Sequence, residues 1–286
     1  MRDFVYFEPK TISEAASLLA RYKDEAKVIA GGTDLLVDMK HDRLQPKYLI
    51  NIKAIPGLDY INFDSEGLRI GALATIRALE KSAELQQKYP IISQTAHHFG
   101  SIAIRNVATI GGNLCHAVPS ADTAPGLIGL SASARIMGND GDRVVPLDYF
   151  FTGSGKTVLK TGELLVEIQV PPMPANTRGV YLKYAIRSKS DLPVVGVAVV
   201  ATMEPKQGLC RDIKIALGNV APTPIRACFA EEVIRGQQVT PALIEKCAQA
   251  AADEAHPRPG SIRASPEYKK AMVKVFTRKA LEEVLA

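Results

Sequence analysis

The chain has 286 residues, of which 47% are hydrophobic and 23% are charged, a composition typical of globular proteins rather than of disordered or fibrous ones. At about 150 residues per domain, this length allows one large domain or two of modest size. The net charge of +5 comes from basic residues spread along the chain without a run of five, so the sequence does not predict a nucleic-acid partner.

Membrane spans, secretion signals and metal sites are not predicted either. The longest apolar stretch, residues 192–203, is well short of the roughly 20 residues of a membrane span and is typical of a buried strand. The first residues lack the apolar core of a secretory signal, so we expect a cytoplasmic protein. No two cysteines form a CxxC pair, so we expect neither a metal site nor a disulfide framework, and any iron–sulfur cluster would belong to a partner.

Residues 1–55 are predicted to form a small α/β unit. Thr11 and Glu14 are spaced as in a capping box, in which each side chain accepts a hydrogen bond from an exposed backbone N–H, and they predict the start of a helix. Strands are expected over 26–30 and 48–52. The apolar stripe of the helix would consist of Ala15, Leu18, Leu19 and Tyr22.

A second α/β pattern follows and ends in a cluster of prolines. It predicts a strand over 68–73, a helix after Thr75, a helix before Phe99, a helix over 123–130, and strands near Val144 and over 164–170. Pro171, Pro172 and Pro174 cannot continue a sheet, because proline fixes φ and lacks the N–H donor. We therefore predict one domain over 1–174, with subdomains of about 1–55 and 56–174, and a second domain over 175–286.

The second domain is predicted to hold a three-stranded antiparallel sheet followed by two helices. Its strands would span 180–186, 194–204 and 210–217, with the last two joined by a hairpin. Thr240 before Pro241 and Ser265 before Pro266 each combine a capping side chain with proline at the first helical position, and so predict two helix starts. The fold class expected for the chain is α+β.

Two glycine-rich segments indicate ligand binding. The first, Gly31-Gly32-Thr33-Asp34, is not the dinucleotide fingerprint GxGxxG, because its glycines are adjacent and a third is missing. Paired glycines let a backbone approach a phosphate closely, and successive N–H groups then form an anion-binding nest. The same residues also suit a tight strand-to-helix turn with no ligand.

The second segment runs from Thr109 to Asp122 and includes Gly111, Gly112 and Asn113. Its hydroxyl, amide and carboxylate groups can exchange hydrogen bonds with the hydroxyls of a ribityl chain. Two separate nests and a carboxylate suit a long polyhydroxylated diphosphate. The alternative is an irregular polar loop between two helices.

These segments resemble the two FAD signatures of the flavoprotein (medium) subunit of molybdenum hydroxylases, the xanthine dehydrogenase family, which includes the carbon monoxide and nicotinate dehydrogenases. The similar residues are Ala30-Gly31-Gly32-Thr33-Asp34-Leu35, the stretch from Arg105 to Asn113, and Ser120-Ala121-Asp122-Thr123-Ala124-Pro125. The similarity extends over the whole chain, including Glu163-Leu164-Leu165. It implies a vanillyl-alcohol-oxidase-type (PCMH-type) FAD-binding domain, followed by a smaller α+β domain.

The resemblance also implies which residues contact FAD. Those around the pyrophosphate would be Ile29, Ala30, Gly31, Gly32, Thr33, Asp34, Leu35 and Leu36, with Thr109, Gly112 and Asn113 forming the second half of the cradle. Ala108, Ile110 and Gly111 would be further cofactor-binding residues. Asp122 would hold the ribityl chain, Leu164 and Leu165 would lie beside the adenine or the flavin, Phe99 and Ser101 would lie nearby, and Lys183 would approach the isoalloxazine.

The role of Lys183, and the roles that the resemblance implies for His116 and for the loop over 188–193, have alternatives. Lys183 would stabilise the anionic reduced flavin, although a lone strand lysine is more often a solvated side chain. His116 would either hydrogen-bond the flavin ring or cap its own loop. The loop over 188–193 would border the open flavin face and gate an acceptor, or be a plain hairpin connection.

His97 and His98 are interpreted as ordinary helix residues, because no third metal ligand accompanies them.

The function that the resemblance implies is electron transfer without a catalytic residue or a metal site in this chain. A large molybdopterin-binding partner would oxidise the substrate, and a small partner with two [2Fe–2S] clusters would relay electrons to FAD, in a heterotrimer or a dimer of heterotrimers. The final acceptor would be NAD+, a quinone, a ferredoxin or oxygen. The alternatives are a stand-alone flavoenzyme of the vanillyl-alcohol oxidase fold and a non-redox assembly protein. A subgroup that reduces an aromatic CoA thioester is not expected, because its cysteine-rich insertion is missing.

Overall fold

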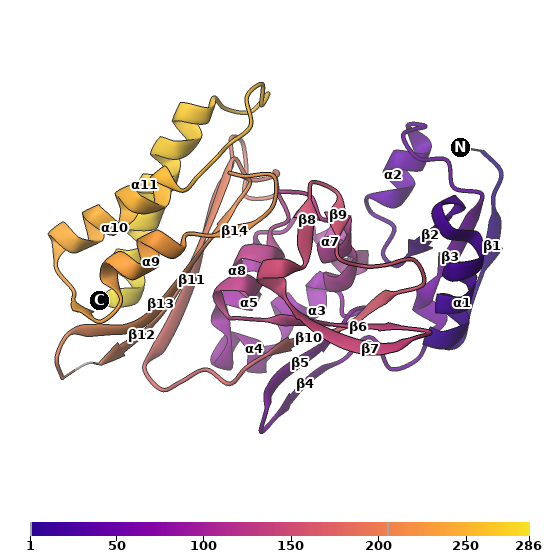
Figure 1. Cartoon of the computed structure of the whole chain (residues 1–286), viewed down its shortest axis with the longest axis horizontal. Coiled ribbons are helices and arrows are strands. Elements are labelled where there is room, and N and C mark those ends of the chain that lie inside the picture. The colour runs from indigo at the N-terminus through magenta and orange to yellow at the C-terminus, as the bar shows by residue number, and fades with distance from the viewer. Residues whose placement is uncertain (1, 205) are drawn as a thin grey trace.

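The computed structural model describes residues 2–204 and 206–286, and within them three sheets of three or more strands follow one another along the chain (Figure 1). The N-terminal unit holds a parallel sheet of order β1-β3-β2. Its elements are β1 Val5–Phe7, α1 Ile12–Tyr22, β2 Ala26–Ile29, α2 Leu35–Lys40 and β3 Tyr48–Asn51, with 3-10 turns at Lys23–Glu25 and Ile52–Ala54. Thr11 caps α1 as predicted, by accepting from the Glu14 N–H at 3.1 Å. The Glu14 carboxylate accepts from the Lys10 N–H rather than from that of Thr11.

The central unit holds an antiparallel sheet of order β4-β5-β10-β6-β7. Its strands are β4 Ile61–Asp64, β5 Gly67–Gly71, β6 Ser133–Gly138, β7 Gly141–Pro146 and β10 Leu164–Val170, and β8 Phe151–Gly153 pairs separately with β9 Lys156–Thr157. Its helices are α3 Ile76–Lys81, α4 Ala83–Lys88, α5 Pro90–His97, α6 Ile102–Val107, α7 Ile110–His116 and α8 Thr123–Gly129, with a 3-10 turn at Leu147–Tyr149. Strand β10, predicted over the same residues, lies at the centre of the sheet and is almost fully buried.

The C-terminal unit contains the three predicted strands and two short additional ones. Strands β11 Thr177–Tyr184, β12 Val195–Glu204 and β13 Leu209–Gly218 form the antiparallel sheet, and β14 Ile225–Arg226 and β15 Gln237–Gln238 both pair with β13. Three helices follow, α9 Cys228–Ile234, α10 Pro241–Asp253 and α11 Pro266–Leu285. Thr240 and Ser265 cap α10 and α11 as predicted, whereas α9 begins after Ala227, which offers no capping side chain, and was not expected from the sequence.

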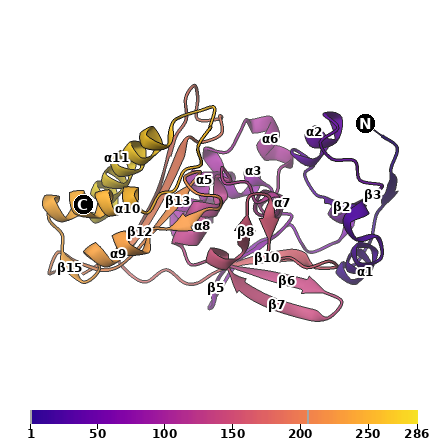
Figure 2. The same ribbon diagram turned by 45° about the horizontal axis from the view of Figure 1, so that its top comes forward.

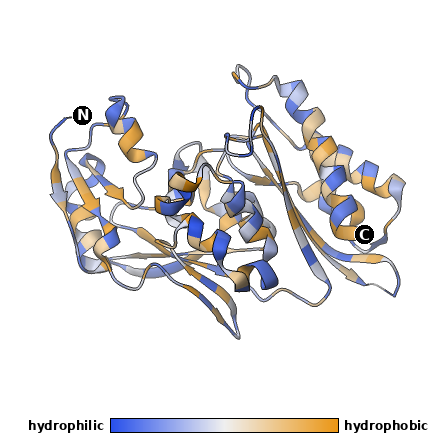
Figure 3. Cartoon of the chain, turned by 180° about the vertical axis from the view of Figure 1, so that it is seen from behind, coloured by the Kyte–Doolittle hydropathy of each residue, from blue (hydrophilic) through white to orange (hydrophobic). Residues whose placement is uncertain are grey.

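The C-terminal sheet is covered on both faces. Successive side chains of a strand point to opposite faces, so Tyr181, Ala198 and Val200 join the core of the central unit, while Val180 and Val199 join a second core under α10 and α11. The helices α10 and α11 carry hydrophobic and hydrophilic residues side by side along their length (Figure 3). Because both faces of this sheet are buried, the apolar stretch over 192–203, which forms most of β12, does not alternate between apolar and polar residues.

The connection between the central and C-terminal sheets, residues 171–176, contains no strand or helix. The domain boundary between residues 174 and 175 stays a prediction. None of the helices within residues 2–204 and 206–286 is both long enough and apolar enough to cross a membrane.

Candidate functional site

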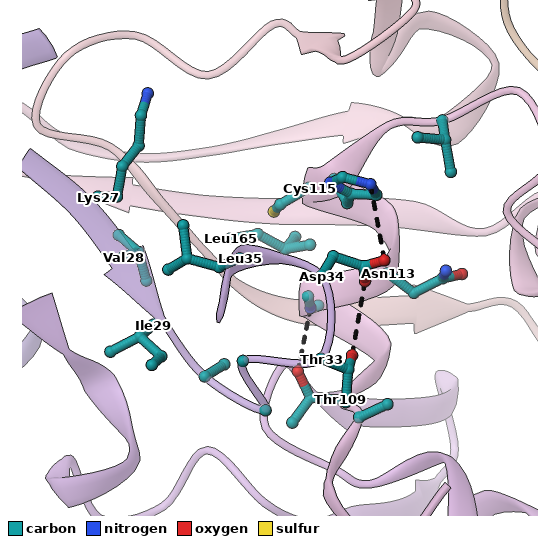
Figure 4. A pocket seen from close by; sticks show the side chains of 18 of the residues that line it. Lys27, Val28, Ile29, Thr33, Asp34, Leu35, Thr109, Asn113, Cys115 and Leu165 are labelled. Atoms are coloured by element: carbon teal, nitrogen blue, oxygen red, sulfur yellow. Dashed lines mark hydrogen bonds and ion pairs between the residues drawn. The ribbon is translucent and has the colours of Figure 1, made fainter. Parts of the chain in front are cut away.

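A cavity of about 640 Å³ lies between the N-terminal and central units. Its walls are the loop from β2 to α2, the junction of α6 and α7, and the start of β10 (Figure 4). Figure 2 shows where the ribbons of α2, α6, α7 and β10 run. These three segments are far apart in sequence. The cavity therefore forms only when the tertiary structure brings the two units together.

The first glycine segment forms the loop that joins β2 to α2. Gly32 has a φ of +72°, which favours glycine, and a Cβ on Gly31 would overlap the carbonyl oxygen of Val107 at the end of α6. Among the described residues, the backbone N–H groups from Gly31 to Leu35 donate to no protein acceptor. All of these residues line the cavity, so the loop offers it a run of uncommitted donors.

The second glycine segment is a helix, and the prediction of a second anion nest is wrong. Thr109 caps α7 by accepting from the Gly112 N–H at 3.1 Å, while the N–H groups of Ile110 and Gly111 donate to the carbonyls of Ala74 and Ala72. These donors are therefore committed within the protein. Gly111 serves close packing, because a Cβ there would lie 2.7 Å from Ala72.

Asp34 and His116 approach each other across the cavity. The His116 Nε2 lies 3.7 Å from the Asp34 Oδ1, and the Thr33 hydroxyl donates to the same carboxylate at 3.5 Å (Figure 4). Asp34 comes from the β2–α2 loop and His116 from the end of α7. Their contact joins the two units beside the uncommitted backbone donors.

The cavity brings most of the predicted site residues together. Those that line it are Ile29, Ala30, Gly31, Gly32, Thr33, Asp34, Leu35, Phe99, Ala108, Thr109, Gly111, Gly112, Asn113, His116, Leu164 and Leu165. Those outside its lining are Leu36, Ser101, Ile110, Asp122 and Lys183. Ser101 caps α6 by accepting from the Ile104 N–H, and Ile110 is fully buried.

Asp122 and Lys183 form a buried ion pair between the central and C-terminal units. The Lys183 Nζ lies 2.9 Å from the Asp122 Oδ2 and also donates to the carbonyl of His98, and the Tyr181 hydroxyl donates to the Asp122 Oδ1. Burial raises the pKa of Asp122 to about 6, although the hydrogen bonds from Lys183 and Tyr181 oppose that rise. Lys183 is 1% exposed, so the alternative of a solvated side chain is wrong.

Several lining residues were not predicted from the sequence. They are Lys27, Val28, Asp38, Arg43, Leu44, Ile52, Cys115, Val118, Ser154, Gly155, Leu159 and Glu163. Cys115 lies inside the second glycine segment, and burial raises the pKa of its thiol to about 12, so the thiol is protonated at neutral pH. Most of the others lie on separate segments without a common motif, and only the folded chain brings them together. Within residues 2–204 and 206–286, no group of histidine, cysteine and carboxylate side chains is arranged to hold a metal ion.

Comparisons with known proteins agree with the motifs. Residues 2–173 match the model of the FAD binding domain in molybdopterin dehydrogenase, and residues 180–284 match that of the CO dehydrogenase flavoprotein C-terminal domain. The xanthine dehydrogenase FAD-binding subunit of Escherichia coli O157:H7 is 32% identical over 289 residues, with 100% of this chain and 98% of the relative covered. The carbon monoxide dehydrogenase medium chain of Hydrogenophaga pseudoflava is 34% identical over 283 residues, with 99% and 97% covered.

Solved structures lead to the same family. A chain of the carbon monoxide dehydrogenase from Hydrogenophaga pseudoflava superposes with a TM-score of 0.95 at 35% identity, with 98% of this chain and 96% of that chain covered. A chain of quinoline 2-oxidoreductase from Pseudomonas putida 86 superposes with a TM-score of 0.91 at 27% identity, with 99% and 96% covered. The resemblance and the fold class predicted from the sequence are confirmed, and the chain belongs to the family of FAD-binding subunits of molybdopterin-dependent dehydrogenases.

Proposed function

We propose that this chain binds FAD in the cavity between its N-terminal and central units and acts as the electron-transfer subunit of a molybdenum-containing dehydrogenase. The observation that carries the proposal is the run of uncommitted backbone N–H groups from Gly31 to Leu35 in the cavity wall. Backbone donors that have no partner within the protein suit the oxygens of a diphosphate. The loop can take this shape because Gly31 lacks the Cβ that would overlap the Val107 carbonyl and because Gly32 has a positive φ.

The rest of the lining fits the other parts of FAD. Phe99, Leu164 and Leu165 offer apolar surface for ring systems, and Thr109 and Asn113 offer polar groups. His116 and Asp34, which also line the cavity, provide a further polar contact. A cavity of about 640 Å³ lies within the usual size of sites for cofactors.

Asp122 and Lys183 would act on the flavin side of the site. Both are buried at the junction of the central and C-terminal units, outside the cavity lining, and the Lys183 Nζ lies 2.9 Å from the Asp122 Oδ2. We propose that the Asp122 carboxylate contacts the ribityl hydroxyls. We also propose that the Lys183 ammonium favours added negative charge on the flavin ring. Both roles would require Asp122 and Lys183 to form hydrogen bonds to the cofactor as well as to each other. Bound FAD would supply the conversion between one-electron and two-electron transfer, and the chain would supply position and electrostatics.

The proposed partners are a large molybdopterin-binding subunit and a small subunit with two [2Fe–2S] clusters, in a heterotrimer or a dimer of heterotrimers. Relatives that are medium chains or FAD-binding subunits of carbon monoxide and xanthine dehydrogenases support this proposal. Electrons would enter from a [2Fe–2S] cluster and leave to NAD+ or another acceptor. The organic substrate would bind to the large subunit.

The visible spectrum of the purified chain, alone and co-expressed with its partners, tests the proposal. We expect about one FAD released per chain, as for a single cofactor site, and we expect an organic substrate to bleach the flavin only in the complex. A chain that binds no flavin in either preparation would refute the assignment of the cavity. A chain that oxidises an alcohol without partners would instead be the stand-alone flavoenzyme.

A further inference from the structure

Helix α6 carries its only charged side chain inward. Arg105 is 6% exposed, whereas Ile102 and Val107 on the same short helix are about half exposed. A surface helix normally shows the reverse arrangement. Because burial of a guanidinium costs free energy unless its donors are all paired, the interior must hold a specific set of acceptors for Arg105.

The guanidinium of Arg105 has one carboxylate and three backbone carbonyls as its partners. Its Nε donates to the Glu80 Oε2 at 2.9 Å, and its Nη1 donates to the carbonyls of Gly100 at 2.8 Å, Phe99 at 3.0 Å and His97 at 3.3 Å. The turn that follows α5 therefore wraps around the guanidinium. The ammonium group of a lysine lacks this planar fork and cannot reproduce the contacts.

Glu80 stays charged in this network. It also accepts hydrogen bonds from Arg77 and His97. Burial alone would raise the pKa of Glu80, but the hydrogen bonds from Arg77, His97 and Arg105 outweigh that effect and lower the pKa to about 2. The anchor for the Arg105 Nε is therefore a carboxylate at any physiological pH.

The segment held by Arg105 forms one wall of the cavity. Phe99, from the wrapped turn, lines the cavity, and so do Ala108 and Thr109, which follow α6 directly. The Val107 carbonyl lies against Gly31, in the loop with the uncommitted donors. Arg105 does not line the cavity itself, but it fixes both edges of the wall that does.

We propose that Arg105 is a positioning residue of the cofactor site. Its guanidinium holds the turn over 97–100 against the end of α6, and the two segments together form one wall of the cavity. This fixes the distance between Phe99 and the Gly31 loop at the value that the cofactor requires. The inference rests on the proposed function, because it assigns Arg105 to the binding of FAD. Arg105 acts through backbone groups and touches no part of the cofactor.

The substitution R105K tests this role, because it keeps the charge beside Glu80 and loses the fork. We expect the dissociation constant of FAD to rise about tenfold, the equivalent of one hydrogen bond to a charged group. The visible circular dichroism of the bound flavin should also change, because the wall that orients the ring has moved. A variant that binds FAD like the wild type with the same dichroism would overturn the proposal.

The matched control is R235K in the C-terminal unit. Arg235 likewise binds carboxylates, those of Asp212 and Glu231, together with one backbone carbonyl, that of Ile213, but it lies outside the cavity. We expect R235K to lower stability without changing the affinity for FAD or the flavin dichroism. An equal loss of FAD affinity in both variants would mean that Arg105 acts only through general stability, which also overturns the proposal.

A second variant covers the case in which R105K does not fold. E80Q keeps the shape of the anchor and removes its charge, and we expect FAD binding about threefold weaker, with an altered flavin dichroism, because a charged acceptor is lost. An unchanged E80Q would overturn the proposal. Failure of the proposed function would look different, because the wild-type chain would then bind no FAD at all.

Discussion

His98 is a half-buried imidazole whose surroundings oppose its protonation. Burial lowers the pKa of His98 to about 4, and the charges of Lys189, His97 and Lys183 act in the same direction. Its Nδ1 is one of the buried atoms that have no hydrogen-bond partner among the described residues. The side chain is therefore neutral at physiological pH, beside the carbonyl oxygen that accepts from Lys183.

The pKa of His98 predicts a loss of stability in acid. Because the unfolded chain takes up the proton near the ordinary value of 6.5 and the folded chain only near 4, the unfolded state binds more protons in this window, and stability falls as the pH decreases through it. We expect H98Q, which cannot be protonated, to show a flatter pH dependence. Urea unfolding of both proteins above and below this window measures the difference, and parallel curves would contradict the prediction.

At the scale of elements, the loop between β2 and α2 is fitted to the end of α6. Gly31 is the point of contact, because its Cα faces the Val107 carbonyl with no room for a side chain. The contact determines where the backbone donors of the loop lie in the cavity. A change at this point should therefore affect ligand binding through geometry alone, without removing a polar group.

The substitution G31A should weaken FAD binding by about tenfold or more, because the added methyl group forces the loop away from α6 and displaces its donors. Gly153 offers a control, since a Cβ there would meet only the Lys156 side chain, at 3.8 Å. We expect G153A to bind FAD normally. Fluorescence titration with FAD compares the two variants, and equal affinities would remove the loop from the binding site.

At the scale of the whole molecule, the central and C-terminal units share the sheet of β11, β12 and β13. The core of the central unit continues onto one face of that sheet through Tyr181, Ala198 and Val200. The Asp122–Lys183 ion pair crosses the same junction and is almost fully buried. Apolar packing and a buried charge pair therefore both contribute to the junction of the two units.

Replacing one member of this pair should lower the free energy of unfolding far more than replacing both. K183M leaves the Asp122 carboxyl buried without its cation, and we expect a loss of about 3–5 kcal/mol in the free energy of unfolding. The double variant K183M/D122N removes the charge as well and should recover most of that loss. Chemical denaturation of the cofactor-free proteins tests this, and similar losses for the single and double variants would argue against an ionised pair.

Local signals in the sequence predicted much of the fold. The span of β10 and the capped starts of α10 and α11 follow from apolar runs, prolines and capping residues within a few positions. Helix α9 lacks such a cap and was missed, as was the three-residue strand β1. Short elements such as these depend on tertiary contacts more than on their own residues.

Only part of the candidate site was predicted, because the sequence shows which residues are adjacent in the chain but not which segments the fold brings together. The Gly31 loop was recognised as a donor-rich turn because its glycines are adjacent in sequence. The helical state of α7 was missed, because Gly111 and Gly112 have low helix propensity, although Thr109 caps the helix and Gly111 packs against Ala72. Arg43 and Ser154 gave no signal, since nothing in their own segments indicates that the fold brings them to one cavity.

The position of β10 has a consequence for the order of events during synthesis. This strand fills the middle of its sheet and supplies Leu164 and Leu165 to the cavity, yet it is the last strand of that sheet to be made. A nascent chain that has not yet released residues 164–170 holds β5 and β6 without the strand that joins them. The cavity is therefore assembled late in translation, and cofactor insertion must wait until nearly the whole central unit has left the ribosome.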